Sequence, residues 1–242
     1  MSAGLAAELC YTGAVRLRPS PATLQRYWPA VTLTDGTSRG GGYIVGFPEL
    51  TAPDPIRLLV SFGRPAAPYG RRDLSHTRDW AEAAEVMARV THTVTVTEIF
   101  GTPFAPADRV RAFTAVVRAL ADDTAPVAIW WPASRLATPP AFEAGGVVNV
   151  RHHDVTGRYV LDTLGLGPLG LPDLQCVCGA LPPEALTAYL AAAAWAVMDG
   201  RGMKAGDVVP GLTPHQRWKV EAGPAFAAPD RPVLTITPDG AA

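Results

Sequence analysis

Few features of this sequence mark a familiar functional class. Its 242 residues include only three cysteines, and this odd number argues against the disulfide framework of a secreted protein. The 21 lysines and arginines nearly balance the 22 aspartates and glutamates, so the formal charge is only −1. Such a chain has no general attraction for nucleic acid or for an anionic membrane. We therefore expect no nucleic-acid partner and no membrane partner.

Long hydrophobic segments are also missing. The longest apolar helix that the pattern predicts, residues 185–198, is too short to span a bilayer. Charged residues at Glu8, Arg16 and Arg18 interrupt the first apolar stretch, unlike the apolar core of a secretory signal. Hydrophobic residues make up 48% of the chain and charged residues 18%, which is typical of a folded globular protein. These features predict a cytoplasmic location.

A glycine-rich stretch at residues 159–181 organises the rest of the sequence. Apolar residues alternate on both sides of it, which predicts a strand, a tight loop and a second strand. Glycines permit the positive φ angles of such a loop, and a proline is tolerated at the first position of a strand. The predicted structural turn comprises Asp162, Gly165, Gly167, Gly170, Pro172 and Asp173.

The spacing of the three glycines matches the G-x-G-x-x-G pattern of dinucleotide-binding proteins. That pattern requires a following helix, whose N-terminal amides meet the pyrophosphate. Here Pro172 follows two residues after the last glycine, and the next residues alternate like a strand. We therefore interpret the glycines as turn residues and expect no cofactor.

The run DTLGLGPLGLPDLQ, together with the earlier segment AEVMARVTHTVTVTEIFG, resembles the bacterial DUF4261 family. Members carry a similar D-T-[LIVM]-G-x-x-x-[LF]-G-L-P-D stretch, and most of the chain from about Leu58 onward fits the pattern. The family has no assigned function, so the resemblance implies no catalytic residues. We interpret residues 1–242 as a single domain of this kind, with residues 34–55 as a Gly/Pro-rich loop insertion.

The pattern of apolar residues predicts an α+β fold, with a mixed β-sheet covered by about three main helices. The helices are expected at residues 79–89, from Pro106 onward, and at residues 182–200. The middle of the chain reads as helix, strand, helix, strand, and its two strands are expected to be parallel. The second of them, residues 125–131, is apolar throughout, which is typical of a strand covered on both faces.

Two clusters in the C-terminal half are candidates for chemistry. His152, His153, Cys176 and Cys178 are possible zinc ligands, although their spacing matches no common structural site. The alternative is that the cysteines are buried small hydrophobes and the histidines lie in a solvated turn. The carboxylates of Asp162 and Asp173 form the second candidate, for acid and base chemistry or for a cation. They could instead accept backbone amides of the loop between them.

Other polar residues give weaker signals. A nucleophile at Cys10, Cys176 or a serine would need His92, His152 or His215 as base. The sequence contains no catalytic motif around such a nucleophile, and His92 is expected in the core. The basic loop of residues 63–72 contains three arginines that suit either a phosphate or acidic partner or a solvated linker. These arginines are Arg64, Arg71 and Arg72.

Two hypotheses for function follow. The first is a non-enzymatic protein-binding module, with a toxin of a bacterial competition system as the hypothesised partner. The second is a hydrolase or metal-dependent enzyme that uses Asp162 and Asp173 with nearby histidine or cysteine. The enzyme hypothesis requires these residues to line one concave pocket. The sequence specifies neither the identity of a partner nor an oligomeric state.

Overall fold

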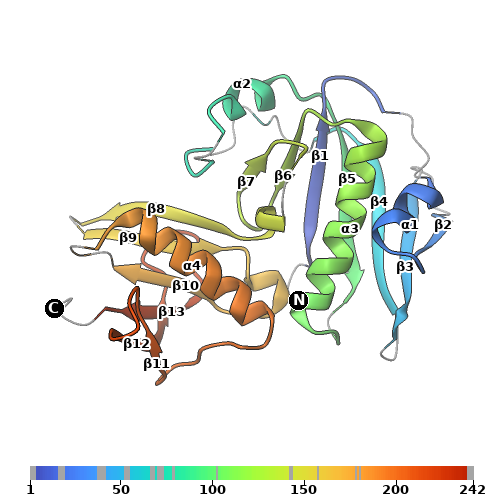
Figure 1. Ribbon diagram of the computed structural model, residues 1–242. Coiled ribbons are helices and arrows are strands. Elements are labelled where there is room, and N and C mark those ends of the chain that lie inside the picture. Colours follow the sequence, from blue (N-terminus) through green and yellow to red (C-terminus); the bar gives the residue numbers. More distant parts are fainter. Residues whose placement is uncertain are drawn as a thin grey trace. The chain divides into compact units, whose positions relative to one another are not determined.

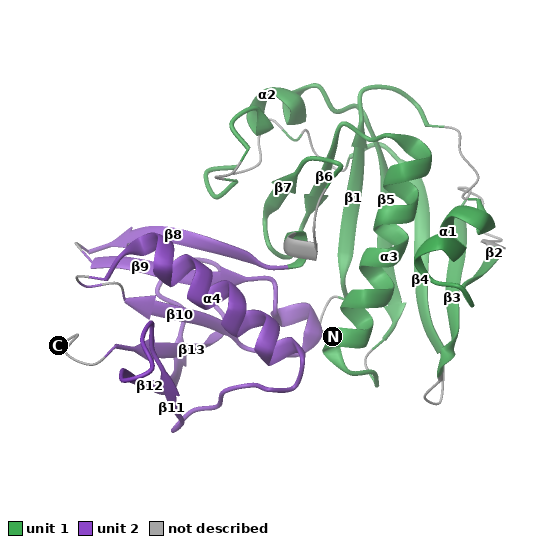
Figure 2. Cartoon of the chain, in the orientation of Figure 1, with its two compact units in different colours: residues 1, 3–147 green, residues 2, 148–242 purple. Residues whose placement is uncertain are grey.

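The computed structural model describes residues 4–15, 20–36, 42–51, 55–65, 69, 74–77, 80–101, 103–141, 144–156, 158–177, 179 and 181–238. The chain divides at Val147 and Val148 into two compact units, the N-terminal unit and the C-terminal unit (Figure 2). The sequence showed no boundary there because no linker separates the units. The 3-10 turn η2 (Ala144–Val147) is followed almost directly by β8 (Asn149–Val155).

The N-terminal unit contains a seven-stranded sheet in the order β2-β3-β4-β5-β1-β6-β7 (Figure 1). All of its neighbouring strands are antiparallel. The strands are β1 (Ala6–Tyr11), β2 (Thr32–Gly36), β3 (Gly42–Thr51), β4 (Pro55–Gly63), β5 (His92–Phe100), β6 (Ala128–Trp131) and β7 (Leu136–Thr138). The helices of this unit are α1 (Pro21–Tyr27), α2 (Ala83–Ala88) and α3 (Pro106–Thr124).

Both faces of this sheet are covered, which explains why β6 is apolar throughout. Helix α3 contacts β1, β4 and β5, and the ring of its Phe113 lies 6.4 Å from the ring of Trp131. On the other face, Trp130 packs 6.4 Å from Tyr69 in a buried cluster with Met87 of α2. The adjacent tryptophans thus point to opposite faces, as the alternation of a strand requires.

The predicted helix, strand, helix, strand order is present as α2, β5, α3 and β6. Strands β5 and β6 run in the same direction, as expected, because each is antiparallel to β1. They do not pair with each other, since β1 lies between them. The N-terminal strand reaches this position from far away in sequence, so no local pattern indicated it.

The structure corrects the interpretation of residues 34–55 as a loop insertion. Much of this range is strand, in the end of β2 and in β3, and both strands belong to an antiparallel ladder. Its glycines serve close approach between strands: a Cβ on Gly46 would lie 2.8 Å from Thr32 Oγ1, and one on Gly42 would lie 2.9 Å from the Val60 carbonyl oxygen. Residues 37–41 and 52–54 lie outside the described residues.

The C-terminal unit contains a six-stranded sheet in the order β11-β12-β13-β10-β9-β8. Its further strands are β9 (Arg158–Leu164), β10 (Asp173–Val177), β11 (Val208–Pro210), β12 (Arg217–Pro224) and β13 (Pro232–Thr237). Strands β10 and β13 are parallel and the other pairs are antiparallel, so this sheet is mixed. Helix α4 (Pro183–Met198) contacts β8, β9 and β10 (Figure 1). Its buried residues include Leu186 and Leu190.

The fold is α+β, as predicted, but it has two sheets where one mixed sheet was expected. The expected helices correspond to α2 and α4, which are shorter than predicted, and to α3, which begins at Pro106 as predicted. In the part of the chain that the structure describes, no helix has the length and apolar character needed to cross a membrane.

A buried ion pair connects α3 to the sheet of the N-terminal unit. Arg109 Nη2 lies 2.6 Å from Glu98 Oε2, and both side chains are almost fully buried. The same carboxylate accepts the backbone N–H of Leu5 at 3.1 Å. Gly101 lies directly against this pair, because a Cβ there would overlap the Glu98 carboxylate.

We expect Gly101→Ala to lower the free energy of unfolding by about 1–3 kcal/mol, because the methyl group forces the buried pair apart. Gly13→Ala is the matched control, since a Cβ at Gly13 would meet no atom within 4 Å. Urea unfolding of both variants checks this expectation. Equal stability of the two variants would contradict the tight packing at Gly101.

Candidate functional site

A row of polar side chains crosses one face of the sheet in the C-terminal unit. Arg151 of β8 pairs in register with Asp162 of β9, which pairs with Gln175 of β10. Gln175 pairs in turn with Thr235 of β13. Residues in register share a face of the sheet. Arg151, Asp162 and Gln175 are almost completely buried.

Asp162 is the centre of this row. Its Oδ1 accepts a hydrogen bond from Arg151 Nε at 3.0 Å, and its Oδ2 accepts one from Arg151 Nη2 at 2.6 Å, so the pairing is bidentate. Arg231 Nη2 also donates to Oδ2, at 2.7 Å. The His153 ring lies 3.1 Å from Oδ1 through its Nε2. The carboxylate thus meets two guanidinium groups and an imidazole.

Asp173 completes the network through the same arginine. Arg231 Nε donates to Asp173 Oδ2 at 2.9 Å. The other oxygen, Oδ1, accepts the backbone N–H of Leu166 at 3.1 Å and the hydroxyl of Thr163 at 3.2 Å. Asp173 therefore accepts a backbone amide of the loop between the two aspartates. The hydrogen bonds given above for Asp162 come from side chains instead.

The loop itself uses its glycines in two ways. Gly165 and Gly170 have φ angles of 132° and 76°, values that side chains disfavour. Gly167 instead begins the 3-10 turn η3 (Gly167–Leu169). Pro172 immediately precedes β10, so its missing N–H interrupts no ladder.

The same polar side chains hold a surface loop of residues 225–231, which we call the clamped loop. Arg151 Nη1 donates to the Ala228 carbonyl at 2.8 Å. Arg231 Nη1 donates to the carbonyls of Ala227 at 3.1 Å and Pro229 at 2.9 Å. Gln175 accepts the Phe226 N–H at 3.0 Å and donates to the Pro224 carbonyl, also at 3.0 Å. Buried charges thus fix the backbone of an exposed segment.

Charge in this network is balanced, with two guanidinium groups and two carboxylates. Burial opposes ionisation of Asp162, but hydrogen bonds from His153, Arg151 and Arg231 outweigh it and lower the pKa of Asp162. For Asp173 burial is the larger effect, and it raises the pKa although the Leu166 amide and Arg231 oppose it. The two carboxylates therefore differ in how firmly they hold a negative charge.

The candidate zinc ligands are divided between the two faces of the sheet. His152 turns toward α4, where its ring nitrogens lie 2.6 Å from the Tyr159 hydroxyl and 2.9 Å from the Thr187 hydroxyl. Its neighbour His153 points to the opposite face, to Asp162. Cys176 is buried and shares the face of His152, with Leu161 in register between them. Cys178 lies outside the described residues.

Two strand spacings, about 10 Å, therefore separate Cys176 from His152 along the sheet, whereas zinc ligands lie within about 2.3 Å of the metal. Among the described residues, no group of three or more His, Cys, Asp or Glu side chains is placed to hold a metal ion.

The other candidate residues are dispersed. Cys10 is buried in the core of the N-terminal unit, and His215 is exposed. His92 is half-buried at the start of β5, where its Nδ1 lies 2.9 Å from the Thr91 hydroxyl, so it is not the core histidine that the sequence suggested. Arg71 and Arg72 lie outside the described residues.

Sequence reasoning missed Arg151 and Arg231. A signal for them was present, because Asp162 stood alone on an apolar face, and a buried carboxylate needs a cation or several donors. The identity of those donors depends on the pairing of β8 with β9, which places Arg151, and on the path of the chain just before β13, which places Arg231. Neither could be deduced from spacing along the chain.

Comparison with known proteins supports the resemblance found in the sequence. Residues 162–237 match the model of the family described as domain of unknown function DUF4261. This segment includes Asp162, Asp173, Gln175 and the clamped loop with Arg231. Arg151 and His153 precede it. No curated protein and no solved structure matches the chain.

We expect Arg231→Met to lower the free energy of unfolding by about 3–5 kcal/mol, because it removes the cation that bridges two buried carboxylates. Arg201→Met is the control: Arg201 pairs with Asp199 at an exposed position, where an ion pair contributes about 0–1 kcal/mol. Urea unfolding measures both. A loss no larger than that of the control would show that Arg231 does not hold the network together.

The pH dependence of stability should distinguish the two aspartates. The lowered pKa of Asp162 contributes stability above its unfolded value that is lost as the pH falls through the folded pKa. The raised pKa of Asp173 contributes stability below its unfolded value that is lost as the pH rises through the folded pKa. As the pH falls from about 6 to about 3, the loss of unfolding free energy caused by Asp162→Asn should therefore shrink. The loss caused by Asp173→Asn should grow over the same range. Urea unfolding across this range is the measurement; costs that change in the same direction would contradict the assignment.

Proposed function

We propose that this protein is a non-enzymatic protein-binding module and that the clamped loop of the C-terminal unit is its binding element. One observation carries the proposal. Side chains of the polar network, those of Arg151, Arg231 and Gln175, form hydrogen bonds that fix the backbone of this loop. A loop that is already ordered loses less conformational entropy when a partner binds.

The energetic cost of the network supports a role beyond simple packing. Burying ionised side chains is expensive, and apolar residues of similar volume often give equal or greater stability. Here each guanidinium has hydrogen bonds left over after meeting the carboxylates, and it donates them to loop carbonyls. An apolar replacement would not hold these carbonyls, so the charged residues specify the conformation of the loop.

Phe226 is the residue we expect to anchor a partner. It is 48% exposed, although its own N–H is held by Gln175. Aromatic side chains are enriched at protein interfaces, and they lose little entropy on binding because they have only two rotatable bonds. A rigid backbone that presents an exposed ring therefore has the features of a binding hot spot.

The alternative, a hydrolase or metal-dependent enzyme, has less support from this geometry. Asp162 and Asp173 are buried and already paired with arginines. His152 and Cys176 share a face of the sheet away from Asp162. No specific contact favours a toxin over another protein as the partner, so that narrower hypothesis stays a prediction.

Affinity capture from a lysate of the source organism tests the proposal with three forms of the chain: wild type, Phe226→Ala and Phe100→Ala. Phe100 is the matched control, because it is 51% exposed and lies in the other unit. We expect a partner that wild type and Phe100→Ala retain. Phe226→Ala should bind the purified partner at least tenfold more weakly at unchanged thermal stability.

Equal capture by all three forms would contradict the role of Phe226 as the anchor. A stoichiometric complex that forms equally well without Phe226 would leave protein binding intact and would refute only this anchor. Failure of wild type to form a complex with any captured protein in purified form would refute the proposal as a whole.

A further inference from the structure

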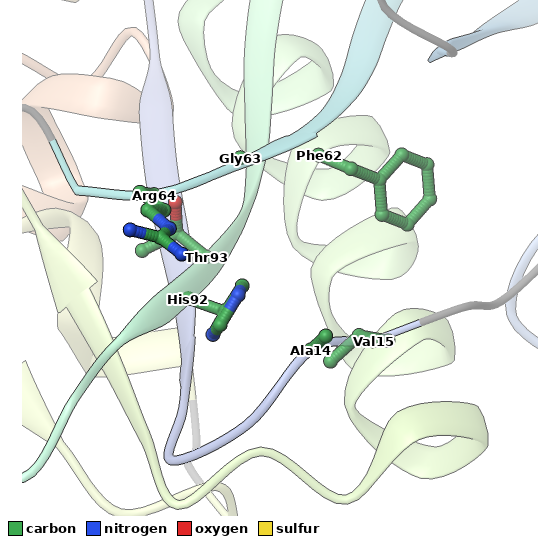
Figure 3. A pocket seen from close by; sticks show the side chains of 7 residues that line it. All are labelled: Ala14, Val15, Phe62, Gly63, Arg64, His92 and Thr93. Carbon is green, nitrogen blue, oxygen red and sulfur yellow. The ribbon is translucent and has the colours of Figure 1, made fainter.

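A cavity of about 300 Å³ lies in the N-terminal unit at one end of its sheet (Figure 3). It forms where the chain leaves β1 and β4 and where β5 begins, so three neighbouring strands supply its walls. The lining residues are Ala14, Val15, Phe62, Gly63, Arg64, His92 and Thr93. The pocket belongs to a different unit from the clamped loop, and nothing in the proposed function uses it.

Two basic side chains, those of Arg64 and His92, border this cavity. Arg64 forms no ion pair or hydrogen bond with any residue that the structure describes, and it is exposed. The Nδ1 of His92 faces the Thr91 hydroxyl at 2.9 Å, which leaves Nε2 without a partner among the described residues. Figure 3 shows both side chains at the cavity, with the Phe62 ring extending away from them.

The remaining lining residues limit which kinds of ligand fit the cavity. Ala14 and Val15 contribute a small apolar surface opposite the two donors, and none of the described lining residues is acidic. The volume is at the lower end of the range for ligand sites, so only a small molecule fits. A guanidinium group can bind carboxylate or phosphate oxygens through two parallel hydrogen bonds.

We propose that this cavity binds the oxyanion group, a carboxylate or a phosphate, of a small organic molecule. Arg64 holds the oxyanion through its guanidinium, and His92 contributes a third hydrogen bond through Nε2. Ala14 and Val15 contact the apolar part of the ligand. Arg64 belongs to the basic loop for which the sequence left open either a phosphate or acidic partner or a solvated linker, and His92 is the second basic group of the site.

Nuclear magnetic resonance of the histidine rings in the full chain tests this proposal, with the His92 signal assigned from its loss in His92→Gln. Acetate, inorganic phosphate and acetamide are titrated separately at constant pH and ionic strength. We expect a saturable shift of the His92 signal with acetate or phosphate and none with acetamide, which has the shape of acetate without its charge. The anion that binds more tightly identifies the ligand class.

Two arginine variants show whether the anion binds at this cavity. Arg64→Ala should weaken binding about tenfold or more, because it removes a charge-assisted contact. Arg158→Ala is the control, since Arg158 is exposed at the start of β9, in the other unit. A shift that never saturates, that acetamide also produces, or that Arg64→Ala leaves unchanged would overturn the proposal. Unchanged signals of the other histidines verify that each variant is folded.

Discussion

The C-terminal unit depends on one partly buried cation, the guanidinium of Arg231, which meets the carboxylates of both Asp162 and Asp173. Without it, two negative charges would be buried with too few donors, and Gln175 would be the residue of β10 that still holds the clamped loop, through the N–H of Phe226. Arg151 of β8 pairs with Asp162 alone among these carboxylates and also donates to the Ala228 carbonyl of the clamped loop. Buried ion pairs add little to stability in general, and their use here is to select one conformation of the loop.

Local features of the fold could be predicted from the sequence, and long-range features could not. Apolar periodicity located α3 and α4, and the alternation around the glycine turn located β9 and β10, because these patterns reflect neighbours along the chain. The place of β1 between β5 and β6 depends on pairs of residues that lie about 80 to 120 positions apart in the sequence. The glycine-rich run of residues 34–42 suggested a loop, although Gly42 belongs to β3, because close approach between strands and a loose turn favour the same residue.

The candidate site shows the same division. Asp162 and Asp173 were recognisable as polar residues around a turn, but their partners come from distant parts of the chain. Arg151 enters through the register of β8 with β9, and Arg231 enters from the clamped loop, directly before β13. His152 and His153 appeared as a pair because they are adjacent in sequence. The pleat of β8 separates them, since neighbouring side chains of a strand point to opposite faces.

The position of β13 has a consequence for how the protein forms during synthesis. This strand lies between β10 and β12, yet it follows both of them along the chain. Until residues 232–237 leave the ribosome, the nascent C-terminal unit consists of two separate ladders, β8-β9-β10 and β11-β12, each with an unpaired edge. Such edges readily pair with other chains. The unit is therefore most exposed to misassembly just before its last strand is inserted, and the two ladders join in the same step that brings Arg231 to its carboxylates.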